Sequence, residues 1–265
     1  MLLYDAHCHY DDEHFDDDRD NIIMDVYNYG VKRIISAGYD LDSSKKALGL
    51  AKKYDFIYCT FGISPNDIKD TWEETKKDID TYVDLLEKER EQGFNKIVAI
   101  GEIGLDYYYS EEKKEIQKLA FKYQIDIANK FDLPIVIHTR DAIMDTIEIL
   151  KENKVQNTGI FHCCPHNREL VKEGLKLGYY ISFCGPITFK NAKNANEIIE
   201  LVPNDRFTTE TDSPYLAPDP KRGTRNDSRN IEFIVKKIAE VKKIDIEEVE
   251  RLAWNNANKI FKIED

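Results

Sequence analysis

The sequence predicts an α/β protein that folds as a (β/α)8 barrel, and three observations support this fold class. Short β-branched runs alternate with longer amphipathic segments along the whole chain, which is typical of repeated βα units. The apolar runs number eight, and 265 residues is an ordinary length for one such barrel. The sequence contains no linker, low-complexity tract or internal repeat, so we expect residues 1–265 to form a single domain.

The predicted strands are apolar runs of six to eight residues. They cover residues 2–8, 31–38, 56–63, 96–103, 133–139, 159–164, 179–184 and 207–212. Helical spacing follows them, for example in segments 16–29, 71–92 and 111–130. After the eighth run, Pro and Gly residues indicate a long loop over 213–224, and helices over 229–241 and 246–255 close the chain. An open doubly wound sheet is the alternative fold.

Composition limits the partners of the chain. The 38 Lys and Arg residues against 50 Asp and Glu give a net charge of -12, which argues against a wide basic surface that coats duplex DNA but allows a small local phosphate site. No basic leader or long apolar run is present, so we expect a cytoplasmic protein without a membrane partner, and we favour a monomer. Five scattered cysteines favour buried free thiols over disulfides.

Residues of the types that bind metals lie at the ends of the predicted strands, where packing alone would prefer Val, Ile or Leu. They are His7, His9, Glu102, His138, His162 and Asp212. The two-residue spacing of His7 and His9 places both imidazoles on one face of a strand. Singly, each of the other four is more typical of a satisfied buried polar group. All of them share the carboxyl end of a predicted strand, which is where barrel proteins build their active sites.

Four imidazoles and two carboxylates exceed the needs of one tetrahedral metal site. We therefore expect a two-metal centre with a bridging carboxylate, for which Glu102 is the best candidate. Two divalent metals can activate water and neutralise charge on a phosphoryl or acyl oxygen, so hydrolysis needs no protein nucleophile. Imidazole-rich ligation suits Zn²⁺ or Mn²⁺, and the carboxylates also allow Mg²⁺. The sequence contains no nucleophile elbow, phosphate-binding glycine loop or dinucleotide fingerprint.

Four segments resemble motifs of the TatD-like metal-dependent hydrolases, often called TatD-related deoxyribonucleases, within the amidohydrolase-like barrel superfamily. The segments are 5–9 (DAHCH), 101–106 (GEIGLD), 138–142 (HTRDA) and 210–218 (ETDSPYLAP), the last followed by 222–226 (RGTRN). The resemblance covers essentially the whole chain and implies a TIM barrel of the metal-dependent hydrolase type. It implies one metal among His7, His9, Glu102 and Asp212, and a second among Glu102, His138 and His162.

The resemblance also implies phosphodiester cleavage, commonly as exonuclease activity on DNA. One segment departs from the family, which usually has His-Cys-Phe-x-Gly where this chain has His162-Cys163-Cys164-Pro165-His166. Pro165 stiffens this loop beside the expected metal. His166 is either an additional proton carrier or a surface residue that caps the next helix.

Catalytic roles follow for the two carboxylates of the expected centre. We assign Asp212 as a metal ligand and as the general base that accepts a proton from the attacking water, and Glu102 as the bridging ligand. Glu210 shares strand parity with Asp212 and points the same way but deeper. It is therefore either a partner of a ligand histidine or a buried structural carboxylate.

Substrate binding requires positive groups near the metals. We expect Arg140, Arg222 and Arg225 to form a local clamp for an anionic substrate, the alternative being ordinary surface charge. The tyrosines at 107–109 either stack on bases of a single strand or pack against the barrel rim.

The leading functional hypothesis is a metal-dependent deoxyribonuclease that acts on a DNA end or a short single strand. The alternative is a metal-dependent amide or ester hydrolase, including an aminoacyl-tRNA deacylase, because the ligand set activates water without selecting the electrophile. A third hypothesis is a binding scaffold with a structural metal. The presence of every expected ligand argues against it.

Overall fold

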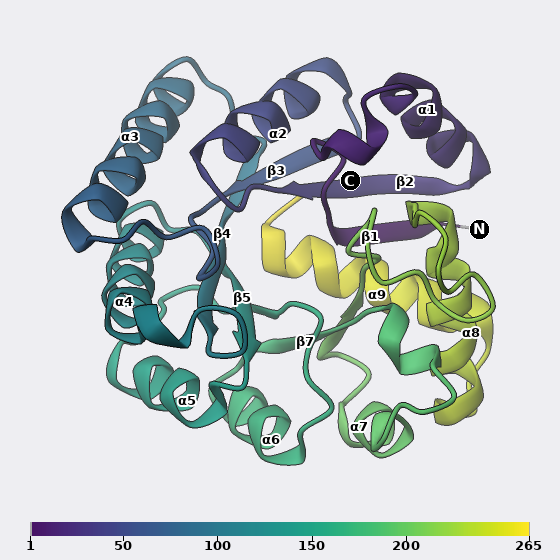
Figure 1. Cartoon of the computed structure of the whole chain (residues 1–265). Coiled ribbons are helices and arrows are strands. Elements are labelled where there is room, and N and C mark those ends of the chain that lie inside the picture. The colour runs from purple at the N-terminus through teal and green to yellow at the C-terminus, as the bar shows by residue number, and fades with distance from the viewer. Residues whose placement is uncertain (1, 265) are drawn as a thin grey trace.

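The computed structural model describes residues 2–264, and its eight strands lie side by side in sequence order (Figure 1). Each neighbouring pair along this order is parallel. The strands are β1 Leu3–Cys8, β2 Val31–Ala37, β3 Ile57–Phe61, β4 Ile97–Asp106, β5 Ile135–Arg140, β6 Gly159–Phe161, β7 Tyr180–Phe183 and β8 Phe207–Thr209. This order confirms the predicted (β/α)8 barrel and excludes the doubly wound sheet, in which the strand order reverses.

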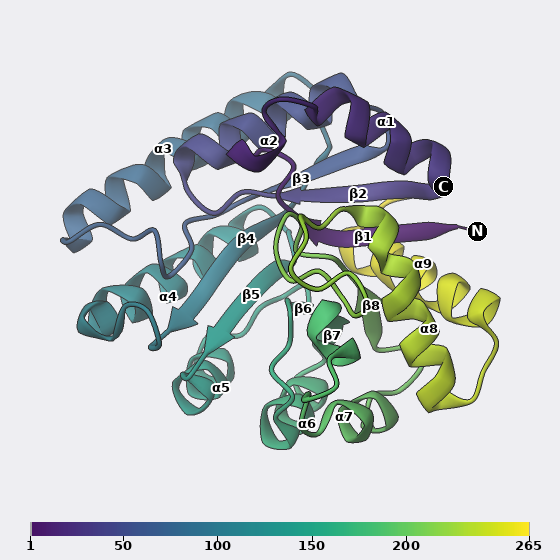
Figure 2. The same ribbon diagram turned by 45° about the vertical axis from the view of Figure 1, so that its right-hand side comes forward.

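Helices surround the sheet on its outer face, and the last of them lies across the amino end of the barrel, as Figures 1 and 2 show from two directions. They are α1 Arg19–Tyr29, α2 Leu41–Lys53, α3 Trp72–Glu91, α4 Lys114–Lys130, α5 Ile143–Glu152, α6 Arg168–Lys176, α7 Ala195–Leu201, α8 Ile231–Lys242 and α9 Ile246–Phe261. Side chains of Asp40, Thr71 and Asn167 accept hydrogen bonds from the first turns of α2, α3 and α6, which explains where these helices begin. Among residues 2–264, no helix combines the length and the apolar character needed to cross a membrane.

The barrel closes where the segment after β8 meets β1. The Asp212 N–H donates to the His7 carbonyl over 3.0 Å, and the His9 N–H donates to the Ser213 carbonyl over 2.7 Å. The fully buried carboxylate of Asp5 accepts further hydrogen bonds across the same seam. Three of the predicted ligands are thus held by backbone pairing at the junction.

Apolar side chains fill the amino end of the barrel, and α9 covers them. The cluster contains Tyr4, Ala6, Ile35, Val98, Ala99, Val136, Ile160 and Tyr180 from the strands, with Trp254, Ala257, Ile260, Phe261 and Ile263 from α9 and its end. A larger apolar cluster lies between the sheet and the outer helices. Because the amino end is filled, a substrate reaches the interior only from the carboxyl ends of the strands.

Some element boundaries differ from the predicted ones. The strands predicted to reach residues 164 and 212 end at Phe161 and Thr209, and within the predicted ranges Cys163 and Asp212 have left-handed backbones with φ of 38° and 57°, which lie outside the β region of the backbone. The strand predicted to end at residue 103 continues to Asp106, because it pairs with β5 over three more residues. The predicted loop over 213–224 contains no helix or strand.

Candidate metal centre

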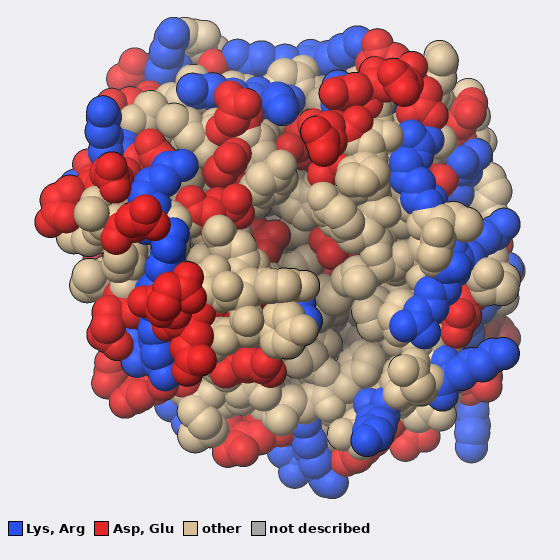
Figure 3. All heavy atoms as spheres, viewed as in Figure 1, with Lys and Arg blue, Asp and Glu red and all other residues tan. Residues whose placement is uncertain are grey.

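The six residues predicted as metal ligands come together at the carboxyl ends of the strands. His7 lies on β1, Glu102 on β4 and His138 on β5, while His9, His162 and Asp212 follow β1, β6 and β8. All but His7 line a cavity of about 740 Å³, and His7 is fully buried beside it. Figure 3 shows acidic side chains at the bottom of the hollow in the middle of this face.

One group of donor atoms is formed by His7, His9, Glu102 and Asp212. The Nε2 atoms of His7 and His9 are 3.2 Å apart. Glu102 Oε2 lies 3.5 Å from His7 Nε2 and 3.9 Å from His9 Nε2. Asp212 Oδ1 lies 3.5 Å and 3.3 Å from the same two nitrogens. These separations suit donors that surround one cation at bonds of about 2.0–2.2 Å.

A second group is formed by Glu102, His138 and His162. Glu102 Oε1 lies 2.9 Å from His138 Nδ1 and 4.0 Å from His162 Nε2. The two oxygens of Glu102 therefore face different groups, as a bridging carboxylate requires. The rings of His7 and His162 stack with centroids 3.7 Å apart, so the two groups are immediate neighbours.

Hydrogen bonds to atoms outside these groups orient two of the imidazoles. His9 Nδ1 lies 3.0 Å from the Ala37 carbonyl oxygen, and His162 Nδ1 lies 2.9 Å from Glu210 Oε1. Because a carbonyl only accepts, His9 Nδ1 carries a proton, and in the neutral ring Nε2 presents its lone pair to the centre. Glu210 orients His162 in the same way, which is the first of the two roles expected for it.

Asp106 orients His138, and sequence reasoning missed it. Its Oδ2 lies 2.9 Å from His138 Nε2, and its Oδ1 accepts from the N–H groups of Tyr108 and Tyr109. Burial would raise the pKa of Asp106, but the bonds from His138 and Tyr109 lower it to about 2. Asp106 lies four residues after Glu102 on the same strand, so strand alternation was the signal that could have identified it.

Histidines and carboxylates of the centre shift one another's pKa values toward their charged forms. Burial alone would lower the pKa values of His9 and His138, but hydrogen bonds and charges from nearby carboxylates raise both to about 9. Burial would raise the pKa of Glu102, yet the surrounding histidines hold it well below its ordinary value. Ionised oxygens and convergent imidazole nitrogens are a donor set that fits two divalent cations sharing Glu102.

The three predicted substrate-binding arginines occupy different positions. Arg140 lines the cavity, and its guanidinium lies 3.9 Å and 4.6 Å from the ring centroids of Tyr108 and Tyr109. Arg222 lies 4.2 Å over the ring of Phe189. The remaining arginine, Arg225, makes two bonds of 2.8 Å and 2.6 Å to the carboxylate of Asp18. Only Arg140 of the three lines the cavity, and the substrate contacts of Arg222 and Arg225 stay predictions.

Other residues of the cavity wall were not predicted or were left open. Asp67 lines the cavity, and burial raises its pKa to about 6 although Ser64 donates to its carboxylate. Tyr109 and Tyr215 also line the wall, and their side chains are 63% and 47% exposed. His166 lies instead on a neighbouring cavity of about 200 Å³.

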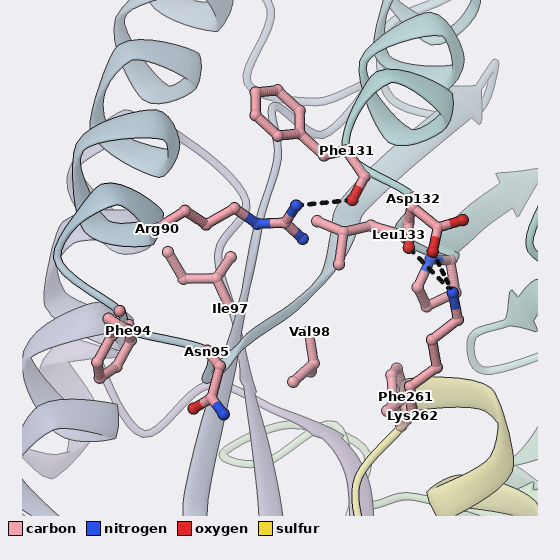
Figure 4. Close-up of a pocket in the computed structure, with 12 residues that line it drawn as sticks. Arg90, Phe94, Asn95, Ile97, Val98, Phe131, Asp132, Leu133, Phe261 and Lys262 are labelled. Carbon is pink, nitrogen blue, oxygen red and sulfur yellow. Dashed lines mark hydrogen bonds and ion pairs between the residues drawn. The ribbon is translucent and has the colours of Figure 1, made fainter.

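A further cavity of about 510 Å³ lies at the amino ends of β4 and β5, opposite the candidate metal centre (Figure 4). Its charged groups already bind a carbonyl or a charged side chain of the same chain. Arg90 donates to the Phe131 carbonyl over 2.8 Å, and the Lys262 ammonium lies 2.6 Å from Asp132 Oδ2. No histidine lines this cavity, which therefore offers no counterpart of the centre described above.

Residues 4–262 match the family model described as TatD related DNase. An uncharacterized metal-dependent hydrolase of Bacillus subtilis is 39% identical over 263 residues, covering 99% of this chain and 100% of the relative. An uncharacterized metal-dependent hydrolase of Escherichia coli K12 is 35% identical over 268 residues, covering 100% of this chain and 97% of the relative.

Solved structures show the same architecture. A TatD homologue from Escherichia coli K12 superposes with a TM-score of 0.88 at 25% identity, covering 99% of this chain and 98% of that one. A TatD family hydrolase from Entamoeba histolytica superposes with a TM-score of 0.84 at 22% identity, covering 98% of both chains, a likeness of fold.

Proposed function

The chain belongs to the family of TatD-related DNases and is a metal-dependent hydrolase, and we propose that it hydrolyses phosphodiester bonds at DNA ends or in short single strands. The observation that carries the proposal is the convergence of four imidazoles and two carboxylates on one cavity. Its rim bears an arginine and exposed tyrosines, which suit a phosphate and a stacked base.

The side chains of the centre have different roles in the proposed reaction. Two divalent cations, as Zn²⁺, Mn²⁺ or Mg²⁺, would be held by these residues and would supply Lewis acidity that lowers the pKa of water and neutralises charge on a phosphoryl oxygen. Glu102 directs one oxygen to each donor group and so fixes both groups relative to each other. Asp212 accepts the proton of the attacking water, since its carboxylate faces the cavity and burial does not prevent its ionisation.

Arg140 is the residue best placed to hold a phosphate. No carboxylate of the described residues lies within 4.0 Å of its guanidinium nitrogens, and the guanidinium lies over the rings of Tyr108 and Tyr109. The acidic remainder of the chain favours a short substrate segment over a long duplex. Arg222 and Arg225 are proposed to contact the substrate farther from the metals.

A direct test follows single-stranded DNA labelled at either end. The purified protein is supplied with Mn²⁺, Mg²⁺ or Zn²⁺, and His138→Ala and Asp212→Ala proteins control for contaminating nuclease. We expect stepwise loss of nucleotides from one end, absent in both variants. Cleavage should also weaken as salt rises, because phosphate contacts release counterions.

Cleavage that persists in both variants would come from another enzyme. If no metal supports cleavage that depends on His138 and Asp212, the proposal fails and the alternative is favoured, an amide or ester substrate such as an aminoacyl-tRNA. Hydrolysis of a neutral amide should be nearly indifferent to salt and to Arg140.

A further inference from the structure

A separate cluster of metal-binding side chains lies next to His162, outside the two donor groups described above. Cys163, Cys184 and Glu210 each offer one donor atom, and the three atoms lie within 4.8 Å of one another. We propose that these residues, here called the thiol site, bind one thiophilic divalent cation of the Zn²⁺ class. This site is independent of the substrate proposed above.

Three neighbouring strands bring the thiol site together. Cys163 follows β6, Cys184 follows β7 and Glu210 follows β8, so all three lie at the carboxyl edge of the barrel. The Cys163 N–H donates to Glu210 Oε1 over 2.5 Å, which fixes the backbone of one thiol against the carboxylate. The left-handed backbone of Cys163 ends strand β6 and permits this approach.

The donor set favours a soft cation. Zn²⁺ bonds thiolate sulfur at about 2.3 Å, so two sulfurs of a tetrahedral site are about 3.8 Å apart. The donor atoms of the thiol site are at most 4.8 Å apart, so they need to move together by about 1 Å to bind the cation. Two sulfurs select Zn²⁺ or Cd²⁺ over Mg²⁺ and Mn²⁺, which prefer oxygen ligands. The two thiol protons leave to solvent when the cation binds.

A small cavity gives the cation access to the site. It has a volume of about 200 Å³, and both Cys163 and Cys184 line it, together with Cys164 and His166. Cys184 is 2% exposed, whereas Cys163 is half-buried and also lines the larger cavity of the candidate metal centre. Three protein donors and an open side leave a fourth position for water or an added ligand.

The thiol site is coupled to the candidate metal centre through Glu210. The oxygen that accepts from Cys163, Glu210 Oε1, also accepts from His162 Nδ1 over 2.9 Å. A cation on this carboxylate draws electron density from the oxygen that orients His162. Occupancy of the thiol site therefore alters how firmly His162 is held toward Glu102.

The test is a Cd²⁺ titration of the full, reduced chain in excess Mg²⁺, followed by ultraviolet absorption. Cadmium bound to sulfur gives a charge-transfer band, whereas cadmium bound only to imidazole and carboxylate does not. We expect the band to saturate at one sulfur-bound Cd²⁺ per chain. Cys163→Ser and Cys184→Ser should each lose about half of it or more, and Glu210→Gln should raise the half-saturating Cd²⁺ concentration by about tenfold or more.

The matched control is Cys59→Ser, which removes a buried thiol on β3 that faces the Lys96 carbonyl and should leave the band intact. Circular dichroism verifies that each variant folds. If Cys184→Ser does not fold, the test rests on Cys163→Ser, because Cys163 is only half-buried. A wild-type protein without the band, or a band that survives both substitutions, overturns the proposal. A Cys163–Cys184 disulfide in mass spectra, with no band after reduction, also overturns it and makes the pair a redox couple.

Discussion

Replacement of Asp106 by Asn tests how the candidate metal centre orients His138. The two side chains are isosteric, so the amide oxygen can still accept from the N–H groups of Tyr108 and Tyr109, at 2.9 Å and 3.0 Å in the wild type. The amide nitrogen then replaces Oδ2, which lies 2.9 Å from His138 Nε2. Because an NH₂ group cannot accept, His138 must change to the tautomer with a bare Nε2 and a protonated Nδ1.

The change removes a donor from the second group. Protonated Nδ1 faces Glu102 Oε1 at 2.9 Å, so it donates to that carboxylate and no longer offers a lone pair to a cation. This orientation costs the bond of 3.2 Å that Asn66 Nδ2 donates to Oδ2, whereas the opposite orientation would leave two backbone N–H groups unpaired, at about 1–3 kcal/mol each, and is disfavoured. Loss of an orienting partner typically weakens metal binding by about 10–100-fold, or roughly 1.4–2.7 kcal/mol.

Calorimetric titration of chelator-treated protein with Mn²⁺ measures this loss. We expect the site that uses His138 to weaken by about 10–100-fold, and the site that uses His7 and His9 to change less. Asp145→Asn is the control, because Asp145 binds the Tyr107 hydroxyl and touches no histidine. If Asp106→Asn binds both cations as tightly as the wild type, Asp106 does not orient a ligand and the reasoning fails.

Three further predictions concern the cavity wall and the cations. Arg140→Ala should raise KM for single-stranded DNA and reduce the slope of log KM against log salt by about 1. Arg225→Ala should have the smaller effect, because Asp18 already binds that guanidinium. Equal effects of the two substitutions would contradict the proposal that Arg140 holds the phosphate. The pKa of Asp67 lies near 6 in the folded chain against 3.8 unfolded, so the folded state binds more protons between these values and loses up to about 3 kcal/mol of stability as the pH rises through them. Urea unfolding of Asp67→Asn at pH 4 and pH 7 should therefore show a smaller loss than the wild type, and an identical loss would contradict the assignment. Mn²⁺ at about 100 times its Kd should stabilise the chain by about 2.7 kcal/mol, a rise in Tm of roughly 5–10 °C in thermal scans. His138→Ala should lose most of that rise, and an undiminished rise would remove His138 from the ligand set.

The strands were predictable because each is an apolar run bounded by polar segments. Their ends were less so. Neither Cys163 nor Asp212 follows a helix, where a left-handed cap is common, so the sequence contains no local sign of their left-handed backbones. The extension of β4 to Asp106 likewise depends on pairing with β5, which is a property of the sheet and not of either strand alone.

The predicted ligands were visible for a related reason. A His, Asp or Glu that interrupts an apolar run at a strand end stands out against its neighbours, as Glu102 and His138 do. The residues that orient them are harder to identify, because each acts across strands: strand parity indicated Glu210 but not the histidine that it contacts, and Asp106 was missed. Glu210 follows β8 but bonds to His162 after β6, and the Ala37 carbonyl of β2 bonds to His9 after β1. Backbone groups such as this carbonyl carry no sequence signal at all.

The basic residues show the same limit for surface charge. Arg140 and Arg225 look equivalent in sequence, since both follow a predicted ligand within a polar loop. The fold brings Asp18, 207 positions away in the chain, onto the guanidinium of Arg225, while Arg140 comes to lie on two tyrosine rings at the cavity wall. An ion pair lowers the attraction of a cation for a substrate phosphate, whereas an aromatic platform leaves that charge available. Contacts between distant segments therefore decide which arginines beside the metal centre remain available to a phosphate. The net charge of -12 does not reveal this.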